Sequence, residues 1–208
     1  MNVKVFGERH TATNALQHFL TLNFDTACYY YSFLGWKHRR APSQREWKRI
    51  NYMDTLFVFT VRDPYTWVEA MYKEPYNYHH PQMAQFPFEQ FLLHPLEDYE
   101  NLLQMWNEKY EGYLRMFAEV PHGLFVRMED FIADQKAVYD RASAFLQARG
   151  EFQEFNKYAS GTGVSERTVG GEATKRKLTR QQYQIINSQI DPAIVLQLGY
   201  QLVNPSQV

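Results

Sequence analysis

The sequence is poor in cysteine, in net charge and in long apolar runs. Its single cysteine, Cys28, excludes an internal disulfide, and it cannot build a zinc site without several suitably spaced histidines. A net charge of −1 argues against broad nucleic-acid binding, which needs a basic face. No stretch approaches the roughly 20 apolar residues of a membrane helix, and none resembles a signal peptide. We therefore expect a soluble, cytoplasmic protein with no membrane or nucleic-acid partner.

The chain has enough apolar residues for a sizeable core. It has 208 residues, of which 45% are hydrophobic and 16% are aromatic. This length and the absence of an internal repeat predict a single domain over residues 1–208.

The N-terminal segment predicts a strand, a polar turn and a helix. Val3 to Phe6 is a short β-type run that ends at Gly7. The apolar residues that follow at helical spacing predict a helix, and Thr11 or Thr13 is expected to cap it. A helix that starts there directs backbone N–H groups and its dipole at one point, which favours an anion.

Later segments continue the alternation of strands and helices. The apolar run from Leu56 to Val61 predicts a buried parallel strand. Pro64 suits the first position of a helix that runs to about Lys73. Weaker patterns predict strands at 28–34 and 123–128, helices at 102–117, 138–146 and 178–190 with Thr179 as cap, loops at 75–95 and 149–178, and a short terminal element at 192–203. The alternation predicts an α/β fold with a mostly parallel central sheet flanked by helices.

Polar residues follow three of the predicted strands. The turns after parallel strands lie along one edge of a sheet, where ligands of α/β proteins bind. The residues that we expect at this edge are cationic or hydroxyl-bearing: Arg9, His10, Thr11, Thr13, Lys37, His38 and Arg62. Such a set suits a ligand with several anionic oxygens.

The first turn is not a nucleoside-triphosphate loop. The residues after Gly7 are Glu-Arg-His-Thr-Ala-Thr, so the second glycine and the lysine of that motif are missing. Asp63 is the obvious candidate for a magnesium ligand, whereas a kinase needs several. The pattern favours anion transfer without a metal. A P-loop-like kinase or nucleotide hydrolase on the same fold, and a nucleotide-binding protein without catalysis, stay as alternatives.

Three segments together resemble the sulfotransferase family in order and spacing. They are Val-Phe-Gly-Glu-Arg-His-Thr-Ala-Thr-Asn at 5–14, Phe-Val-Phe-Thr-Val-Arg-Asp-Pro-Tyr at 57–65, and Val-Arg-Met-Glu-Asp-Phe at 126–131. The resemblance implies a fold related to nucleotide kinases. It also implies that 3′-phosphoadenosine 5′-phosphosulfate is the sulfonate donor.

The resemblance assigns donor contacts residue by residue. Thr11, Ala12 and Thr13 would form the loop around the 5′-phosphosulfate, which continues to Asn14. A basic residue usually precedes this loop. The donor ligands that the resemblance implies outside the loop are Arg9 or His10 before it, Arg62 at the 3′-phosphate and Arg167 in a late loop.

Two alanines depart from the family pattern. Ala12 replaces a glycine, which restricts the loop. Ala70 replaces a serine that would contact the 3′-phosphate. The late Arg-Lys-Gly loop is also matched only at Arg167, and Lys175 or Arg176 is an alternative there.

A Lys-His pair is the candidate catalytic element. The resemblance places the general base after the second strand, where Lys37 and His38 stand. His38 would take the acceptor's proton and Lys37 would stabilise developing charge. His79 and His80 are rivals, in an aromatic stretch that suits both core and the wall of an acceptor pocket. The sequence permits a small phenol, a sugar or a peptide side chain as acceptor.

Overall fold

The protein is described here from a computed structural model, which covers residues 1–29, 31–75, 80–159, 166–168 and 178–207. These residues form two compact units, and each unit combines two stretches of the chain. The first unit contains residues 1–61 and 113–172, and the second contains residues 62–112 and 173–208. That the chain is one domain stays a prediction.

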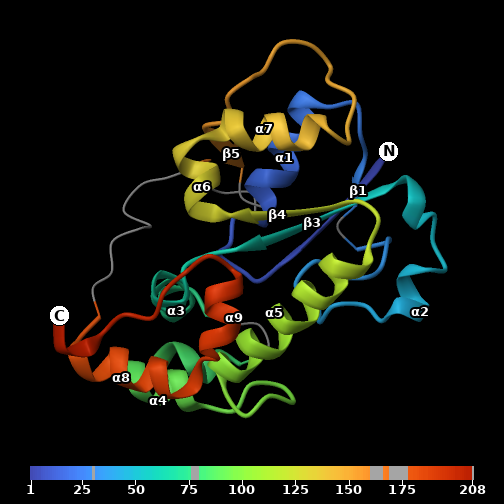
Figure 1. The fold of residues 1–208 in the computed structure, drawn as a ribbon. Coiled ribbons are helices and arrows are strands. Elements are labelled where there is room, and N and C mark those ends of the chain that lie inside the picture. The colour runs from blue at the N-terminus through green and yellow to red at the C-terminus, as the bar shows by residue number, and fades with distance from the viewer. Residues whose placement is uncertain (30, 76–79, 160–165, 169–177, 208) are drawn as a thin grey trace. The chain divides into compact units, whose positions relative to one another are not determined.

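A four-stranded parallel sheet is the centre of the first unit (Figure 1). Its strands are β1 (Asn2–Gly7), β2 (Cys28–Tyr29), β3 (Thr55–Val61) and β4 (Gly123–Arg127), in the spatial order β2-β1-β3-β4. β1 therefore lies inside the sheet, with Gly7 paired to Thr60 of β3. The predicted α/β fold with a parallel sheet flanked by helices is confirmed.

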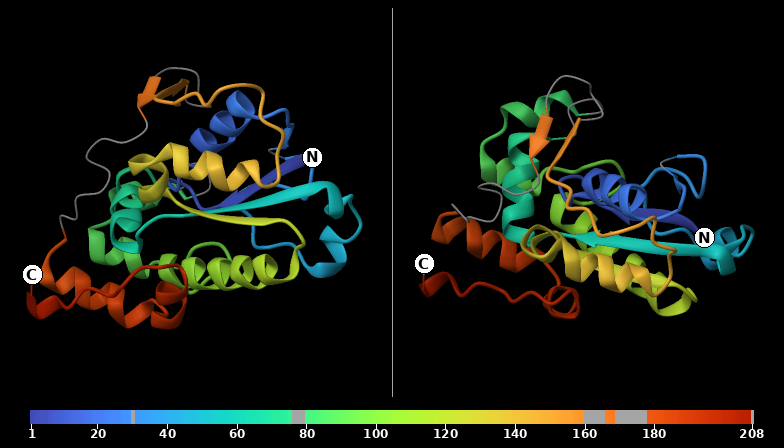
Figure 2. Two further views of the ribbon diagram at one scale, coloured as in Figure 1. Left: turned by 45° about the horizontal axis from the view of Figure 1, so that its top comes forward. Right: turned by 90° about the horizontal axis from the view of Figure 1, so that it is seen from above.

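Helices α1 (Thr13–Asn23), α6 (Met128–Ala133) and α7 (Gln135–Ser143) pack on one face of this sheet (Figures 1 and 2). Alternate residues of the strands, such as Val3 and Val5, form a core with them. It is mainly aliphatic and includes Phe19, Phe24 and Phe131, and we call it the aliphatic core. The opposite face is aromatic. There Phe6 and Phe59 lie 5.9 Å and 5.8 Å from the ring of Tyr113, near the end of α5 (Leu102–Glu119).

The second unit is helical. It contains α3 (Pro64–Lys73), α4 (Phe88–Leu93), the first part of α5, α8 (Arg180–Gln189) and α9 (Pro192–Gln197). Tyr65 joins its segments, because its hydroxyl donates to Asn187 Oδ1 at 2.5 Å and accepts the Val203 N–H at 2.9 Å. Pro64 begins α3 as predicted, and Thr179 caps α8 through a capping box.

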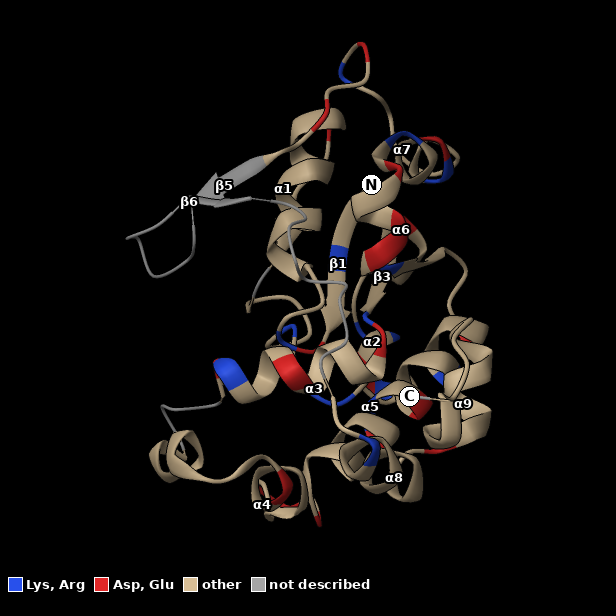
Figure 3. Ribbon diagram, turned by 90° about the vertical axis from the view of Figure 1, so that its left-hand side faces the viewer, with Lys and Arg blue, Asp and Glu red and all other residues tan. Residues whose placement is uncertain are grey.

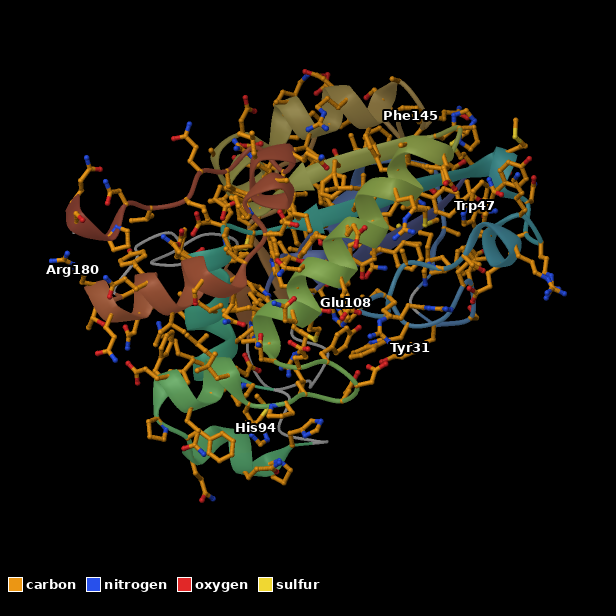
Figure 4. The ribbon with its side chains drawn as sticks, turned by 60° about the horizontal axis from the view of Figure 1, so that its bottom comes forward. Tyr31, Trp47, His94, Glu108, Phe145 and Arg180 are labelled. Carbon is orange, nitrogen blue, oxygen red and sulfur yellow. The ribbon has the colours of Figure 1, made fainter. Side chains whose placement is uncertain are left out.

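Short elements complete the described chain. They are α2 (Gln44–Trp47), β5 (Lys157–Ala159), β6 (Glu166–Thr168) and the 3-10 turns η1 (Tyr52–Asp54), η2 (Pro81–Gln85) and η4 (Pro205–Gln207). Trp47 at the end of α2, labelled in Figure 4, packs against Tyr52 with ring centroids 5.2 Å apart.

Three predictions about elements were wrong. Of the strand expected at 28–34, the described residues pair with the sheet over Cys28–Tyr29, and a turn with positive φ at Leu34 and Gly35 follows. The segment 75–95, predicted to be irregular, contains η2 and α4. The polar segment 149–178 includes the antiparallel pair β5 and β6. In all three cases local composition gave no strong periodicity.

No helix within the described ranges is long and apolar enough to cross a membrane.

Candidate functional site

The loop between β1 and α1 has the backbone geometry of an anion site. His10 and Ala12 have φ values of 63° and 65°, whereas Thr11 between them does not have a positive φ. Alternation of this kind turns successive N–H groups towards the same side, as in the backbone nests that bind anions. The loop leads directly into α1, whose dipole adds partial positive charge. Both features favour a phosphate or sulfate group.

Neither threonine caps α1, so this expectation was wrong. The N-cap residue is Ala12, which has no side-chain hydroxyl, and Thr13 is the first helical residue. The Thr11 hydroxyl is used inside the loop instead. It donates to the Glu8 carbonyl at 2.6 Å and shares a hydrogen bond of 2.7 Å with the Thr60 hydroxyl. Thr60, which sequence reasoning missed, thereby joins the loop to β3.

Gly7 lies in close contact with β3. A Cβ atom built on Gly7 would be 2.0 Å from Thr60 Oγ1 and 2.7 Å from the Thr60 carbonyl oxygen. No side chain fits at this distance, so the start of the loop requires glycine.

The predicted Lys37–His38 pair lies against this loop. The Gly7 N–H donates to the Lys37 carbonyl at 3.0 Å, and His38 Nδ1 bonds to the Gly7 carbonyl. Lys37 Nζ donates to Asn14 Oδ1 in the first turn of α1. Four residues that the sequence placed in two separate segments are thus joined: Gly7, Asn14, Lys37 and His38.

The hydrogen bond to Gly7 assigns the His38 tautomer. A carbonyl oxygen only accepts, so Nδ1 must carry the proton. In the neutral ring Nε2 then holds the lone pair, which is the state that a general base needs.

Burial changes the acid–base chemistry of Lys37. The side chain is almost fully buried, and this desolvation lowers its pKa from 10.5 to about 8. The lysine is therefore still mainly a cation at neutral pH. A cation that is partly removed from water interacts more strongly with an anion than an exposed one.

Further contacts hold the segment that carries Lys37 and His38. The Tyr113 hydroxyl donates to the Arg39 carbonyl at 2.5 Å, and Arg39 Nη1 donates to the Leu34 carbonyl at 3.2 Å. The Trp36 ring meets the His38 ring edge-on, with centroids 4.8 Å apart. The candidate base His38 is therefore held by contacts before and after it in the chain.

Arg62 belongs to the second unit, where it directly follows the last residue of β3. Its Nε donates to the Thr66 hydroxyl at 3.0 Å, and Asp63 caps α3 by accepting the Thr66 N–H at 3.0 Å. Thr66 is thus the hydroxyl beside Arg62, whereas position 70 of α3 is an alanine. The role of Arg62 at a phosphate stays a prediction.

The other predicted site residues have fewer described contacts or lie outside the described residues. Arg9 is half-buried and its N–H donates to Glu8 Oε2 at 3.3 Å, so the structure does not choose between Arg9 and His10 as the donor contact. Arg167 pairs with Tyr158 in the β5–β6 sheet, but its side chain lies outside the described part. His79, Lys175 and Arg176 also lie outside the described residues, and His80 precedes η2.

The left-handed conformation of Ala12 leads to a first prediction. A residue with a Cβ atom costs the folded state roughly 1–2 kcal/mol in this region. Glycine avoids this cost, but it makes the unfolded chain more flexible, and this offsets part of the gain in stability. We expect Ala12→Gly to raise the free energy of unfolding by about 0.5–1 kcal/mol, measured by urea denaturation. Ala15→Gly, inside α1, is the control and should destabilise. A less stable Ala12→Gly variant would contradict the assigned conformation.

No group of three or more His, Cys, Asp or Glu residues able to hold a metal ion is found in the described portion of the chain. Comparison with protein-family models and with curated proteins gives no match for this sequence. The loop after β1 and the segment that holds Lys37 and His38 are therefore the features that indicate a function.

Proposed function

We propose that the chain is a sulfotransferase, which moves a sulfonate group from 3′-phosphoadenosine 5′-phosphosulfate to a hydroxyl or amine acceptor. One observation carries the proposal. The backbone of Gly7, at the start of an anion-type loop, bonds both to Lys37 and to the candidate base His38. A cation, a correctly oriented base and a nest of N–H groups in one place suit transfer between anionic oxygens.

The donor's 5′-phosphosulfate would lie against the N–H groups of Thr11 to Asn14, with Arg9 or His10 beside it. Arg62 and Arg167 would hold the 3′-phosphate. When bound, the donor would supply an activated sulfonate, and its phosphate oxygen would keep the electron pair of the sulfur–oxygen bond as the leaving group. The alternating φ values of the loop suit such a group, because they direct successive backbone N–H groups to one side.

His38 would act through Nε2. This atom takes the proton of the acceptor hydroxyl or amine while the acceptor atom bonds to sulfur. The bond from Nδ1 to Gly7 keeps the ring in the tautomer that accepts there. Lys37, held at Asn14, stabilises the negative charge that develops on the departing phosphate oxygen.

Ligand-induced stabilisation tests the donor site. We expect 3′-phosphoadenosine 5′-phosphate, at about 100 times its dissociation constant, to add about 2.7 kcal/mol to stability. For a chain of this size that is a rise in Tm of roughly 5–10 °C by calorimetry.

ATP with magnesium and adenosine 5′-phosphate are the matched comparison ligands. The first should stabilise less because the loop lacks the triphosphate motif, and the second because it lacks the 3′-phosphate. Stabilisation by ATP–magnesium alone would contradict the proposal and favour a kinase or nucleotide hydrolase.

A further inference from the structure

A buried charge in β1 is not used by the proposed mechanism. Lys4 is fully buried in the interior strand of the sheet, between Val3 and Val5, which face the aliphatic core. It is the blue segment of β1 in Figure 3. Because side chains alternate along a strand, Lys4 shares the opposite face with Phe6. Its Nζ lies 5.2 Å from the centroid of the Phe6 ring. Interior strands are normally apolar, so this lysine needs a physical reason.

The ammonium group of Lys4 holds the turn that precedes the catalytic pair. Its Nζ donates to the Gly35 carbonyl at 2.5 Å. Leu34 and Gly35 have φ values of 62° and 76°, and this left-handed turn brings the chain back towards β1. The residues after it are Trp36, Lys37 and His38.

β1 therefore contacts this segment at two points. Lys4 bonds to Gly35, and Gly7 bonds to Lys37 and His38. In an extended strand these two residues of β1 are about 10 Å apart. The first contact fixes the position of the turn, and the second fixes the position of the His38 imidazole. Without the first, the bonds of Gly7 to Lys37 and His38 hold this segment on β1 from its far end.

A buried lysine at this position costs free energy of desolvation, so packing by itself does not explain why a lysine is there. Burial and, to a smaller extent, the nearby charges of Arg39 and Lys37 together lower the pKa of Lys4 from 10.5 to about 8. An apolar side chain of similar length would avoid this cost, as replacements of buried charges often do. The contact with Gly35 is what an apolar residue cannot supply.

We propose that Lys4 is a positioning residue, which holds the turn at Gly35 on β1 so that His38 keeps its hydrogen bond to Gly7. The catalytic consequence of this role rests on the proposed function, whereas its effect on the imidazole does not. Lys4 acts through His38 and does not itself contact the reacting groups.

The test is Lys4→Met, which keeps the length of the side chain and removes the donor. ¹⁵N NMR of the neutral His38 ring reports which nitrogen carries the proton. In the wild type we expect the proton on Nδ1, and in Lys4→Met we expect a mixture of both tautomers. The kcat should fall by about 10²-fold, as a base displaced by about 1 Å would cause. Affinity for 3′-phosphoadenosine 5′-phosphate should stay unchanged, because the loop is intact.

Val5→Ala is the matched control. Val5 is on the same strand but faces the aliphatic core, so its truncation destabilises the sheet without touching Gly35. It should leave the His38 tautomer as in the wild type. An equal tautomer change in both variants would show a general loss of stability and overturn the proposal, as would an unchanged tautomer in Lys4→Met.

Two results separate this proposal from the proposed function. If the tautomer changes in Lys4→Met but the wild type transfers no sulfonate to any acceptor, the positioning role stands and the sulfotransferase proposal fails. If Lys4→Met does not fold, Lys4→Gln carries the test, because its shorter amide also loses the Gly35 contact. A wild-type tautomer in Lys4→Gln overturns the positioning role.

Discussion

Replacing His38 with alanine is expected to lower turnover by about 10²–10⁴-fold, the usual contribution of a general base. Nε2 of this ring is the atom that would accept the proton, because the bond from Nδ1 to Gly7 determines the tautomer. The proposed donor contacts are the N–H groups of Thr11 to Asn14, whereas the ring bonds to the carbonyl of Gly7. Stabilisation by 3′-phosphoadenosine 5′-phosphate should therefore persist in the variant. Turnover is measured as release of this product with phenol, sugar and tyrosyl-peptide acceptors.

His18→Ala is the control for this experiment. His18 is exposed on α1 and stacks on Phe155 at 6.0 Å, so its loss removes a histidine of the same unit without touching Gly7. It should keep wild-type turnover. Wild-type turnover in His38→Ala would refute its role and move the base to His10, His79 or His80.

Gly7→Ala is expected to have the largest effect on stability. Its Cβ would stand 2.0 Å from Thr60 Oγ1 and 2.7 Å from the Thr60 carbonyl oxygen, and the second atom belongs to the backbone of β3. Either the loop or β3 must move. We expect a loss of about 3 kcal/mol, at the upper end of overpacking effects, in urea denaturation. The loop geometry should be disturbed as well, so ligand-induced stabilisation should fall.

Gly150→Ala and Thr60→Ala test whether the clash with Thr60 causes the loss of stability in Gly7→Ala. A Cβ at Gly150 meets nothing within 4 Å, so that variant should stay within about 0.5 kcal/mol of the wild type. In the double variant Gly7→Ala with Thr60→Ala, the hydroxyl clash is removed but the carbonyl clash remains. The losses of stability in Gly7→Ala and Thr60→Ala should therefore add up to more than the loss in the double variant. Full additivity would mean that the clash with the Thr60 hydroxyl is not the cause.

Some elements could be predicted because their signals are local. The run Leu56–Val61 is almost wholly apolar, and with Thr55 it forms β3 as a fully buried strand. Pro64 has the fixed φ that suits the first turn of α3, and Thr179 with Gln182 forms the capping box of α8. Each of these signals acts between residues that are close in the chain.

Other features depend on residues that are distant in the chain, and these were missed. The threonines beside Ala12 looked like helix caps, but Thr60, a residue of another strand, is the partner of the Thr11 hydroxyl. The segment after Tyr29 has β-forming residues, yet it turns at Leu34 and Gly35. The bond from Lys4 to Gly35 joins residues that are 31 positions apart, so neither segment alone predicts it.

The sequence by itself determined the alternation of strands and helices, the parallel sheet and the residue types near its polar edge. Hydrophobic periodicity and helix-end chemistry are properties of short segments, so they can be read without the fold. The tertiary structure alone decided which of those residues meet. It joined Gly7 to Lys37 and His38, and it assigned the proton of the imidazole to Nδ1. It also brought the buried Lys4 to the carbonyl of Gly35, because hydrogen bonds between distant segments form only when the sheet is assembled.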